Sequence, residues 1–240
     1  MLTNFYFNNF AHYFVIDYLI MSLFKPLFFT LLLSIISICS WAEESENSVS
    51  RFFVAMPDEE IEYLNMSLKN EMVELYKIGT SAKTRNLLGG ESWISYIDST
   101  RINITLAEGK CFMTVKQYDQ KCGTKIYALV KTMYTPIADN DICFYNERME
   151  KLNSDKIFEL PKFKDFFAKT NDKRLCEVMD KIPAIFLKVE VSDNGDFWVS
   201  LNDMWFDVLD RDISDMLLQI KKKNPLCYKW TGKRFKVSEN

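Results

Sequence analysis

The stretch from Ile102 to Tyr145 places the strongest constraint on the fold, because it contains four strand-like segments in succession. The segments are short and rich in β-branched and aromatic residues, and turn-forming residues separate them. They cover residues 102–106, 112–118, 126–134 and 142–145. Such a succession predicts an antiparallel meander, in which each strand pairs with the next. The third segment is expected to be central, because both of its faces are apolar.

Helical patterns lie on both sides of this meander. In each pattern apolar residues recur at helical spacing, which predicts a helix with one buried face. Asn65 and Asn70 lower the helix propensity of the first pattern, so a break is expected near residues 65–69. Gly79 is expected to end that pattern. The helical patterns cover residues 61–75, 163–167, 175–182 and 213–220.

Two hairpins are predicted after the meander. In the first, Ile185–Asn202, the apolar faces of the two strands meet only if the loop has an odd number of residues. The loop Asp193–Gly195 satisfies this condition. The second hairpin is expected to turn at Thr231–Gly232 and to place Tyr228 opposite Phe235. The predicted fold class is therefore α+β: one antiparallel sheet, built from the four-strand meander and the two later hairpins, with helices packed on it.

The first part of the chain, residues 1–42, predicts a presequence that contains a signal peptide. The pattern begins at Met21, which we expect to be the true translation start. It has a positive charge, an apolar run and a small-residue cleavage site, namely Lys25, residues 27–38 and Ser40–Ala42. Cleavage after Ala42 leaves residues 43–240, and this length is enough for a single α+β domain.

Two alternatives remain open for this N-terminal segment. Residues 13–38 are long and apolar enough for an uncleaved membrane anchor, apart from Lys25. A lipoprotein would be acylated at Cys39, but Ile38 is larger than the residue expected before such a cysteine. We expect an exported protein, periplasmic or envelope-associated, that meets a membrane only through this segment if the segment stays uncleaved.

The charge pattern limits the class of partner. The chain carries 30 basic and 33 acidic residues, so its formal net charge is −3. No block of like charge is longer than the three lysines Lys221–Lys223. This pattern argues against nucleic acid or an anionic membrane surface as the main partner. The expected partner is instead another protein or a component of the cell envelope.

Histidine is the residue whose scarcity most limits the chemistry. The single histidine, His12, lies in the segment that is expected to be removed. A mature chain without histidine has no Ser-His-Asp or Cys-His catalysis and no histidine-bound zinc. Carboxylate, lysine and tyrosine chemistry stay open, including a pair of carboxylates of the kind that glycosidases use.

The cysteines and a group of aspartates give no evidence of a metal site. Five cysteines follow the predicted cleavage site, and an odd number leaves at least one thiol free. They form no C-x-x-C motif, so we interpret them as small buried apolar residues. Four aspartates between residues 207 and 215 match no calcium loop and suit the start of a helix. No cofactor or metal is predicted. The cysteines are Cys111, Cys122, Cys143, Cys176 and Cys227.

Two groups of residues resemble the pattern of a known family. The first group is Phe53–Asp58, Glu71–Val73, Gly79, Lys83, Asn86 and Gly90–Ser92. The second group is Val130, Thr132, Pro136, Asp139, Asp141, Phe144 and Tyr145. Together they resemble a family of exported Bacteroidales proteins catalogued as a domain of unknown function (DUF3256). The resemblance covers nearly all of the mature chain, and it implies no activity and no functional residues.

These observations favour a non-enzymatic binding or interaction module of the cell envelope. The alternative is a hydrolase that uses carboxylates alone and acts on glycan or the cell wall. Trp198, Trp205 and Phe206 are the candidate binding residues, because an exposed aromatic patch is typical of a binding surface. The alternative explanation is that these three residues simply cover the sheet, because aromatic residues in strands usually pack across a pleated face. No catalytic residue is assigned.

Overall fold

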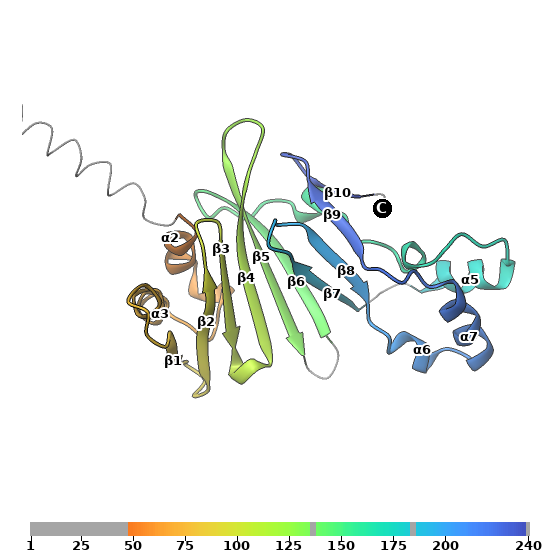
Figure 1. Ribbon diagram of the computed structural model, residues 1–240, viewed down its shortest axis with the longest axis horizontal. Helices are drawn as coiled ribbons and strands as arrows, with labels where there is room; N and C mark the ends of the chain where they lie inside the picture. Colours follow the sequence, from red (N-terminus) through yellow and green to blue (C-terminus); the bar gives the residue numbers. More distant parts are fainter. Residues whose placement is uncertain (1–47, 135–137, 183–185, 239–240) are drawn as a thin grey trace, which may run out of the picture. The chain divides into compact units, whose positions relative to one another are not determined.

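The computed structural model describes residues 48–134, 138–182 and 186–238. Within these ranges the fold is α+β, with two antiparallel sheets and packed helices (Figure 1). The predicted fold class is therefore confirmed. The predicted signal peptide and its cleavage site lie outside the described residues. No helix within the ranges given above is both long and apolar enough to cross a bilayer.

The first sheet is a meander in which each strand pairs with the next along the chain. Its last four strands are those predicted from the sequence, and two further strands precede them. The strands are β1 (Lys83–Arg85), β2 (Glu91–Ile97), β3 (Arg101–Leu106), β4 (Cys111–Asp119), β5 (Lys125–Tyr134) and β6 (Ala138–Asn146).

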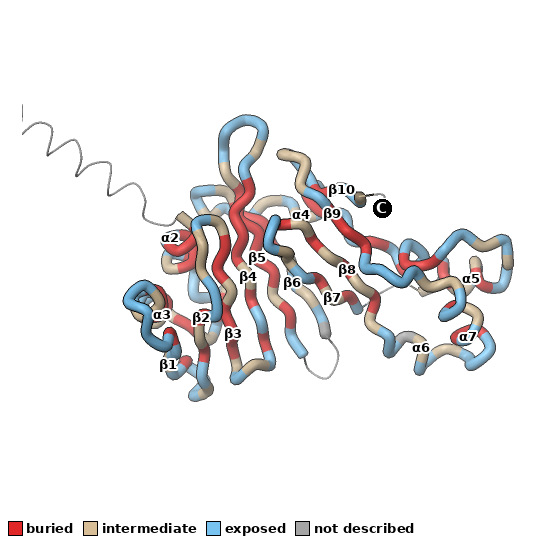
Figure 2. The backbone as a smooth tube through the Cα atoms, viewed as in Figure 1, coloured by how far each residue is buried: buried red, intermediate tan, exposed pale blue. Residues whose placement is uncertain are grey.

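Strand β5 has strands on both sides and is buried on both faces along most of its length, as predicted. Successive residues of a strand face opposite sides of its sheet. Ala128 and Val130 accordingly lie in one apolar core, and Tyr127 and Leu129 lie in another. Figure 2 shows this buried stretch along β3, β4 and β5. Met133 and Tyr134, at the end of β5, are the exceptions because they are exposed.

The later hairpins form a second sheet, whereas the sequence suggested that they extend the meander. The outer edge of β6 is already occupied by the chain that follows it: the N–H of Leu152 donates to the carbonyl of Phe144 at 2.7 Å. The hairpins therefore pack one face against the meander, where Phe197 stacks on Phe144. The strand order is β10 (Phe235–Val237), β9 (Leu226–Trp230), β8 (Phe197–Leu201) and β7 (Leu187–Val191).

The hairpin of β7 and β8 has the predicted register, with Val189 opposite Val199. The N–H of Ser192 donates to the carbonyl of Asp196 at 2.9 Å, which closes the three-residue loop that the sequence predicted. Gly195 has a φ of +85°, a conformation that glycine adopts without strain. An odd number of loop residues was therefore enough to predict the register of this hairpin.

The hairpin of β9 and β10 has a different register from the prediction. Phe235 lies opposite Trp230, and Tyr228 lies opposite Val237, so the loop has four residues rather than two. The hydroxyl of Thr231 stabilises the longer loop by donating to its last carbonyl at 2.6 Å. A shift of two residues keeps every side chain on the same face, so the pattern of apolar and charged residues does not distinguish the two registers.

Helices α2 (Ser48–Ala55) and α3 (Met66–Lys77) pack on the core that contains Leu129. Asn65 caps α3, because its side chain accepts a hydrogen bond from the N–H of Leu68 at 3.0 Å. The break expected near residues 65–69 is therefore the start of this helix. Within the described ranges the other helices are η2 (Asp58–Glu60), η3 (Ala107–Gly109), α4 (Ser154–Ile157), η4 (Phe163–Phe166), α5 (Lys173–Lys181), α6 (Trp205–Val208) and α7 (Arg211–Ile220).

The loop between β4 and β5 supports the β9–β10 hairpin. The indole N–H of Trp230 donates to the carbonyl of Asp119 at 2.8 Å. The N–H of Lys121 donates to the carbonyl of Gly232 at 3.0 Å. A Cβ atom on Gly232 would lie 2.6 Å from the Lys121 side chain, so glycine permits this close approach. The meander therefore fixes the position of the last hairpin.

Candidate functional site

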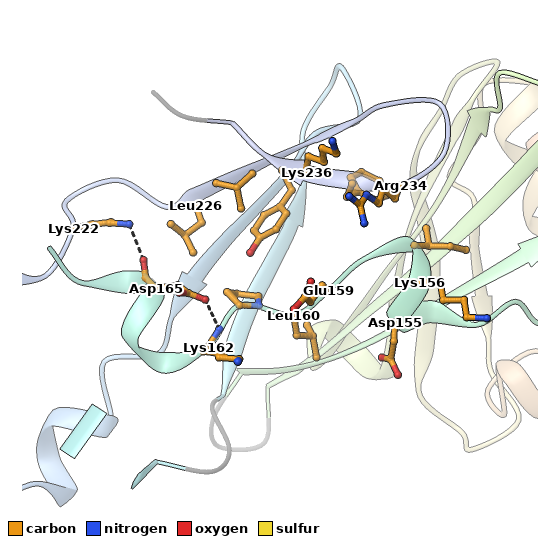
Figure 3. Close-up of a pocket in the computed structure, with 15 residues that line it drawn as sticks. Asp155, Lys156, Glu159, Leu160, Lys162, Asp165, Lys222, Leu226, Arg234 and Lys236 are labelled. Atoms are coloured by element: carbon orange, nitrogen blue, oxygen red, sulfur yellow. Dashed lines mark hydrogen bonds between the residues drawn. The ribbon is translucent and has the colours of Figure 1, made fainter. Parts of the chain in front are cut away.

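A cleft of about 570 Å³ lies between the segment 155–165 and the β9–β10 hairpin. In Figure 3, Glu159 and Leu160 lie on one side of this cleft, and across from them lie Lys236 on β10 and Arg234 at the end of the loop before it. The volume is within the range of roughly 300–1,000 Å³ that is typical of small-molecule sites. We call it the β10 cleft.

Local hydrogen bonds fix the segment that forms one wall of the β10 cleft. Asn153 caps α4 by accepting from the N–H of Lys156 at 3.2 Å. Asp165 accepts from the N–H of Lys162 at 2.7 Å and so closes the first turn of η4. The ammonium of Lys222 donates to the carbonyl of Asp165 at 2.8 Å (Figure 3). This wall is therefore held at both ends by local bonds, and Lys222 adds a bond from the chain that follows α7.

The floor of the cleft is apolar, with one polar group. Phe158 packs edge to face on Tyr228, with 5.0 Å between ring centroids. Tyr228 is only 6% exposed, and its burial, with Asp165 and Glu159 nearby, raises its pKa to about 12. Its hydroxyl forms no hydrogen bond within the described residues, and its oxygen is not one of the fully buried unpartnered atoms, which are Arg101 Nε and Tyr145 Oη. At neutral pH this hydroxyl is protonated and can donate a hydrogen bond to a ligand.

Cations outnumber carboxylates around the β10 cleft. Lys222 is bound to a carbonyl, whereas the other four cationic side chains form no ion pair within the described part of the chain. The five cations are Lys156, Lys162, Lys222, Arg234 and Lys236. The three carboxylates are Asp155, Glu159 and Asp165. In a chain of net charge −3 this is a local positive excess, which favours an anionic ligand.

The lining residues do not form a recognisable catalytic group. All three carboxylates belong to exposed residues, and burial is the usual means of raising the pKa of a carboxyl group for acid catalysis. Neither cysteine nor histidine lines the cleft. No group of three or more potential metal ligands is present within the ranges that the structure describes. The arrangement suits binding by charge, hydrogen bonding and apolar contact.

The structure places the three aromatic candidates on different elements. Trp198 is half-buried on β8, beside Cys227 and on the face away from the core between the sheets. Phe206 packs against that core, and the Lys221 ammonium lies 5.3 Å from the centre of its ring. Trp205 begins α6, and its side chain lies outside the described part of the chain. None of the three lines the β10 cleft. Their role in binding stays a prediction.

Sequence reasoning did not identify the residues of the β10 cleft. The two walls are about seventy positions apart in the sequence and meet only because the second sheet folds against the segment after β6. The available signals were the basic residues Lys233–Arg234 and Lys162–Lys164. Each of these reads as an ordinary solvated turn when taken alone.

The comparisons with known proteins identify the family. The family model described as "Protein of unknown function (DUF3256)" matches residues 42–235. The chain belongs to this family. The resemblance inferred from dispersed residues is thereby confirmed, and the family description assigns no function to DUF3256.

A solved structure shares the DUF3256 fold seen here. It is a domain of an uncharacterized protein from Porphyromonas gingivalis W83, with a TM-score of 0.68 and 18% sequence identity. The match covers 81% of this chain and 99% of the other. At this identity the likeness shows a common fold. No curated protein matches the chain.

Proposed function

We propose that this DUF3256 protein is a non-enzymatic binding module of the cell envelope and that the β10 cleft binds an anionic ligand. One observation carries the proposal. A buried tyrosine with an unpartnered hydroxyl lies in a cleft whose rim has four cationic side chains without ion-pair partners among the described residues. A ligand that supplies oxygen acceptors and negative charge satisfies both features at once.

The cleft chemistry defines the kind of ligand. Arg234 can bind a carboxylate or a phosphate through two parallel hydrogen bonds. Lys156 and Lys162 act as point charges at the opposite wall. Leu160 and Pro161 supply apolar surface between these charges. The ligand is therefore an anionic molecule with an apolar portion, and its binding weakens as salt screens the exposed charges.

The signal-peptide pattern in the sequence supports the proposal that the protein is exported to the cell envelope. The signal-peptide pattern ends at Ala42, and the region matched by the family model begins at that residue. Edman sequencing of exported material is expected to begin at Glu43. Recovery of a chain that still begins at Met1 or Met21 would contradict cleavage.

Binding of two labelled polyanions tests the proposal. Fluorescence anisotropy measures how tightly labelled polyglutamate and labelled polygalacturonate bind to the exported chain. The same measurement is made with the Arg234→Glu, Lys236→Glu double variant. We expect at least one polymer to bind the wild type and to bind the double variant at least tenfold more weakly. The Lys169→Glu, Lys173→Glu double variant is the matched control, because both lysines are exposed and lie outside the cleft.

Two results of this experiment count against the proposal. One is that neither polymer binds, or that the control variant weakens binding as much as the Arg234→Glu, Lys236→Glu variant. The other is release of reducing ends from polygalacturonate by the wild type, with loss of this release in Glu159→Gln. The second result would favour the carboxylate-dependent hydrolase instead.

A further inference from the structure

Strand β10 is an outer strand of the second sheet and borders the β10 cleft. The N–H of Ser238 donates to the carbonyl of Cys227 at 2.7 Å, which defines one hydrogen-bonded pair between β9 and β10. Hydrogen-bonded and non-hydrogen-bonded pairs alternate in an antiparallel ladder. Phe235 and Val237 therefore direct their backbone N–H and carbonyl groups away from β9, at the open edge of the sheet.

These outward backbone groups have no hydrogen-bond partner in the described residues. Two other sheet edges are closed by comparison. At β6 the edge is covered by Leu152, and at β7 the N–H of Val189 donates to the side-chain oxygen of Asn140 at 2.9 Å. An open edge strand is a template on which a further strand can pair. All three residues of β10 line the cleft.

The outer face of β10 determines one side-chain type of an added strand. Lys236 lies directly opposite Lys229 in the ladder, and both are exposed. A residue that pairs with Lys236 from the cleft side projects on this same face, next to a lysine that already has a like-charged neighbour. Opposite charges across a ladder stabilise pairing and like charges destabilise it. Aspartate or glutamate therefore fits this position.

The inner face of β10 determines the other side-chain type. Residues that pair with Phe235 or Val237 project toward the floor of the cleft and the wall that carries Leu160 and Pro161. The floor is apolar apart from the Tyr228 hydroxyl, and the wall also carries the charged side chains of Glu159 and Lys162. Small or branched apolar side chains therefore fit these positions. Acidic and apolar residues thus alternate along the strand that fits β10.

Resting on the function proposed above, we infer that the ligand of the β10 cleft is an extended polypeptide segment of alternating acidic and apolar residues, which pairs with β10 as an additional strand. The outward groups of Phe235 and Val237 supply the backbone bonds. Lys236 and Arg234 select the acidic residues, and the apolar wall receives the others.

The test uses a synthetic peptide of alternating valine and glutamate, and a second peptide in which lysine replaces glutamate. The protein variant is Val237→Pro, which removes an outward N–H that the β9 ladder does not use. Because one backbone hydrogen bond is lost, Val237→Pro is expected to bind the valine–glutamate peptide about fivefold more weakly than the wild type. The valine–lysine peptide is expected not to bind.

Arg85→Pro is the matched control. Arg85 is also at a non-hydrogen-bonded position of a three-residue edge strand, β1, and does not line the cleft. The affinity of the Arg85→Pro protein for the valine–glutamate peptide should equal that of the wild type. Hydrogen exchange on the wild type adds a readout that does not depend on folding of the variant, because peptide binding should slow exchange at the Phe235 and Val237 amides.

Two outcomes overturn the strand-pairing inference. One is unchanged exchange at both amides while the peptide is bound. The other is equal affinity of folded Val237→Pro and Arg85→Pro. If the Arg234→Glu, Lys236→Glu double variant still loses polyanion binding, the binding function stands and only the peptide inference fails.

Discussion

Replacement of Phe197 by alanine should remove a large share of the stability of the packing between the two sheets. Phe197 is 0% exposed and stacks on Phe235, with 4.1 Å between ring centroids. It also stacks on Phe144 of the first sheet, with 6.4 Å between ring centroids, and packs edge to face on Phe158 at 5.2 Å. Truncation of a buried phenylalanine to alanine costs about 3–5 kcal/mol. Total stabilities of folded domains are about 5–15 kcal/mol, so this loss is substantial.

Urea unfolding monitored by circular dichroism measures the effect. We expect a lower midpoint with an unchanged dependence on urea concentration, because the folded and unfolded surfaces are nearly the same. Phe112→Ala is the control: Phe112 is 44% exposed and has one aromatic contact, to Tyr134. Phe112→Ala should lower the free energy of unfolding by less than about 1 kcal/mol. Equal losses for the two variants would refute the assignment of Phe197 to the core between the sheets.

Two further predictions concern titratable groups. Iodoacetamide should modify Cys122 first, because it is exposed and the Thr124 hydroxyl lowers its pKa. Peptide mass spectrometry should find slow reaction at the thiols whose pKa burial raises, namely Cys111, Cys143 and Cys227; faster reaction there than at Cys122 would contradict the burial. Tyr228 has a folded pKa of about 12, above the ordinary value of 10.0, so it contributes stability below pH 10 that is lost as pH rises toward 12. Tyr228→Phe should therefore flatten this alkaline loss in thermal unfolding, and an unchanged profile would count against the assigned environment.

The parts of the fold that followed from the sequence are those set by alternation within one segment. Ala128 and Tyr127 lie on opposite buried faces because both faces of β5 were visibly apolar. The register of Val189 and Val199 followed from the parity of one loop. The register of Phe235 did not, because a shift of two residues leaves the alternation unchanged.

The separation into two sheets and the candidate site depended on contacts between distant segments. Leu152 closes the edge of β6, and nothing in its local sequence indicates that role. The β10 cleft unites two segments that each look like ordinary surface. Lys162 and Arg234 become informative only when they lie around the same buried tyrosine. Sequence patterns predict which faces of an element are buried and where the chain turns, whereas this site depends on how the sheets pack.

NMR chemical-shift mapping with polyglutamate tests the central claim most directly, because it locates the binding site without any substitution. Titration is expected to shift the amide signals of residues 156–160, of Lys162 and of residues 234–237 together, and added salt is expected to reverse the shifts. Shifts confined to Trp198 and α6, or to the exposed face of the meander, would place the ligand elsewhere and contradict the assignment of the β10 cleft.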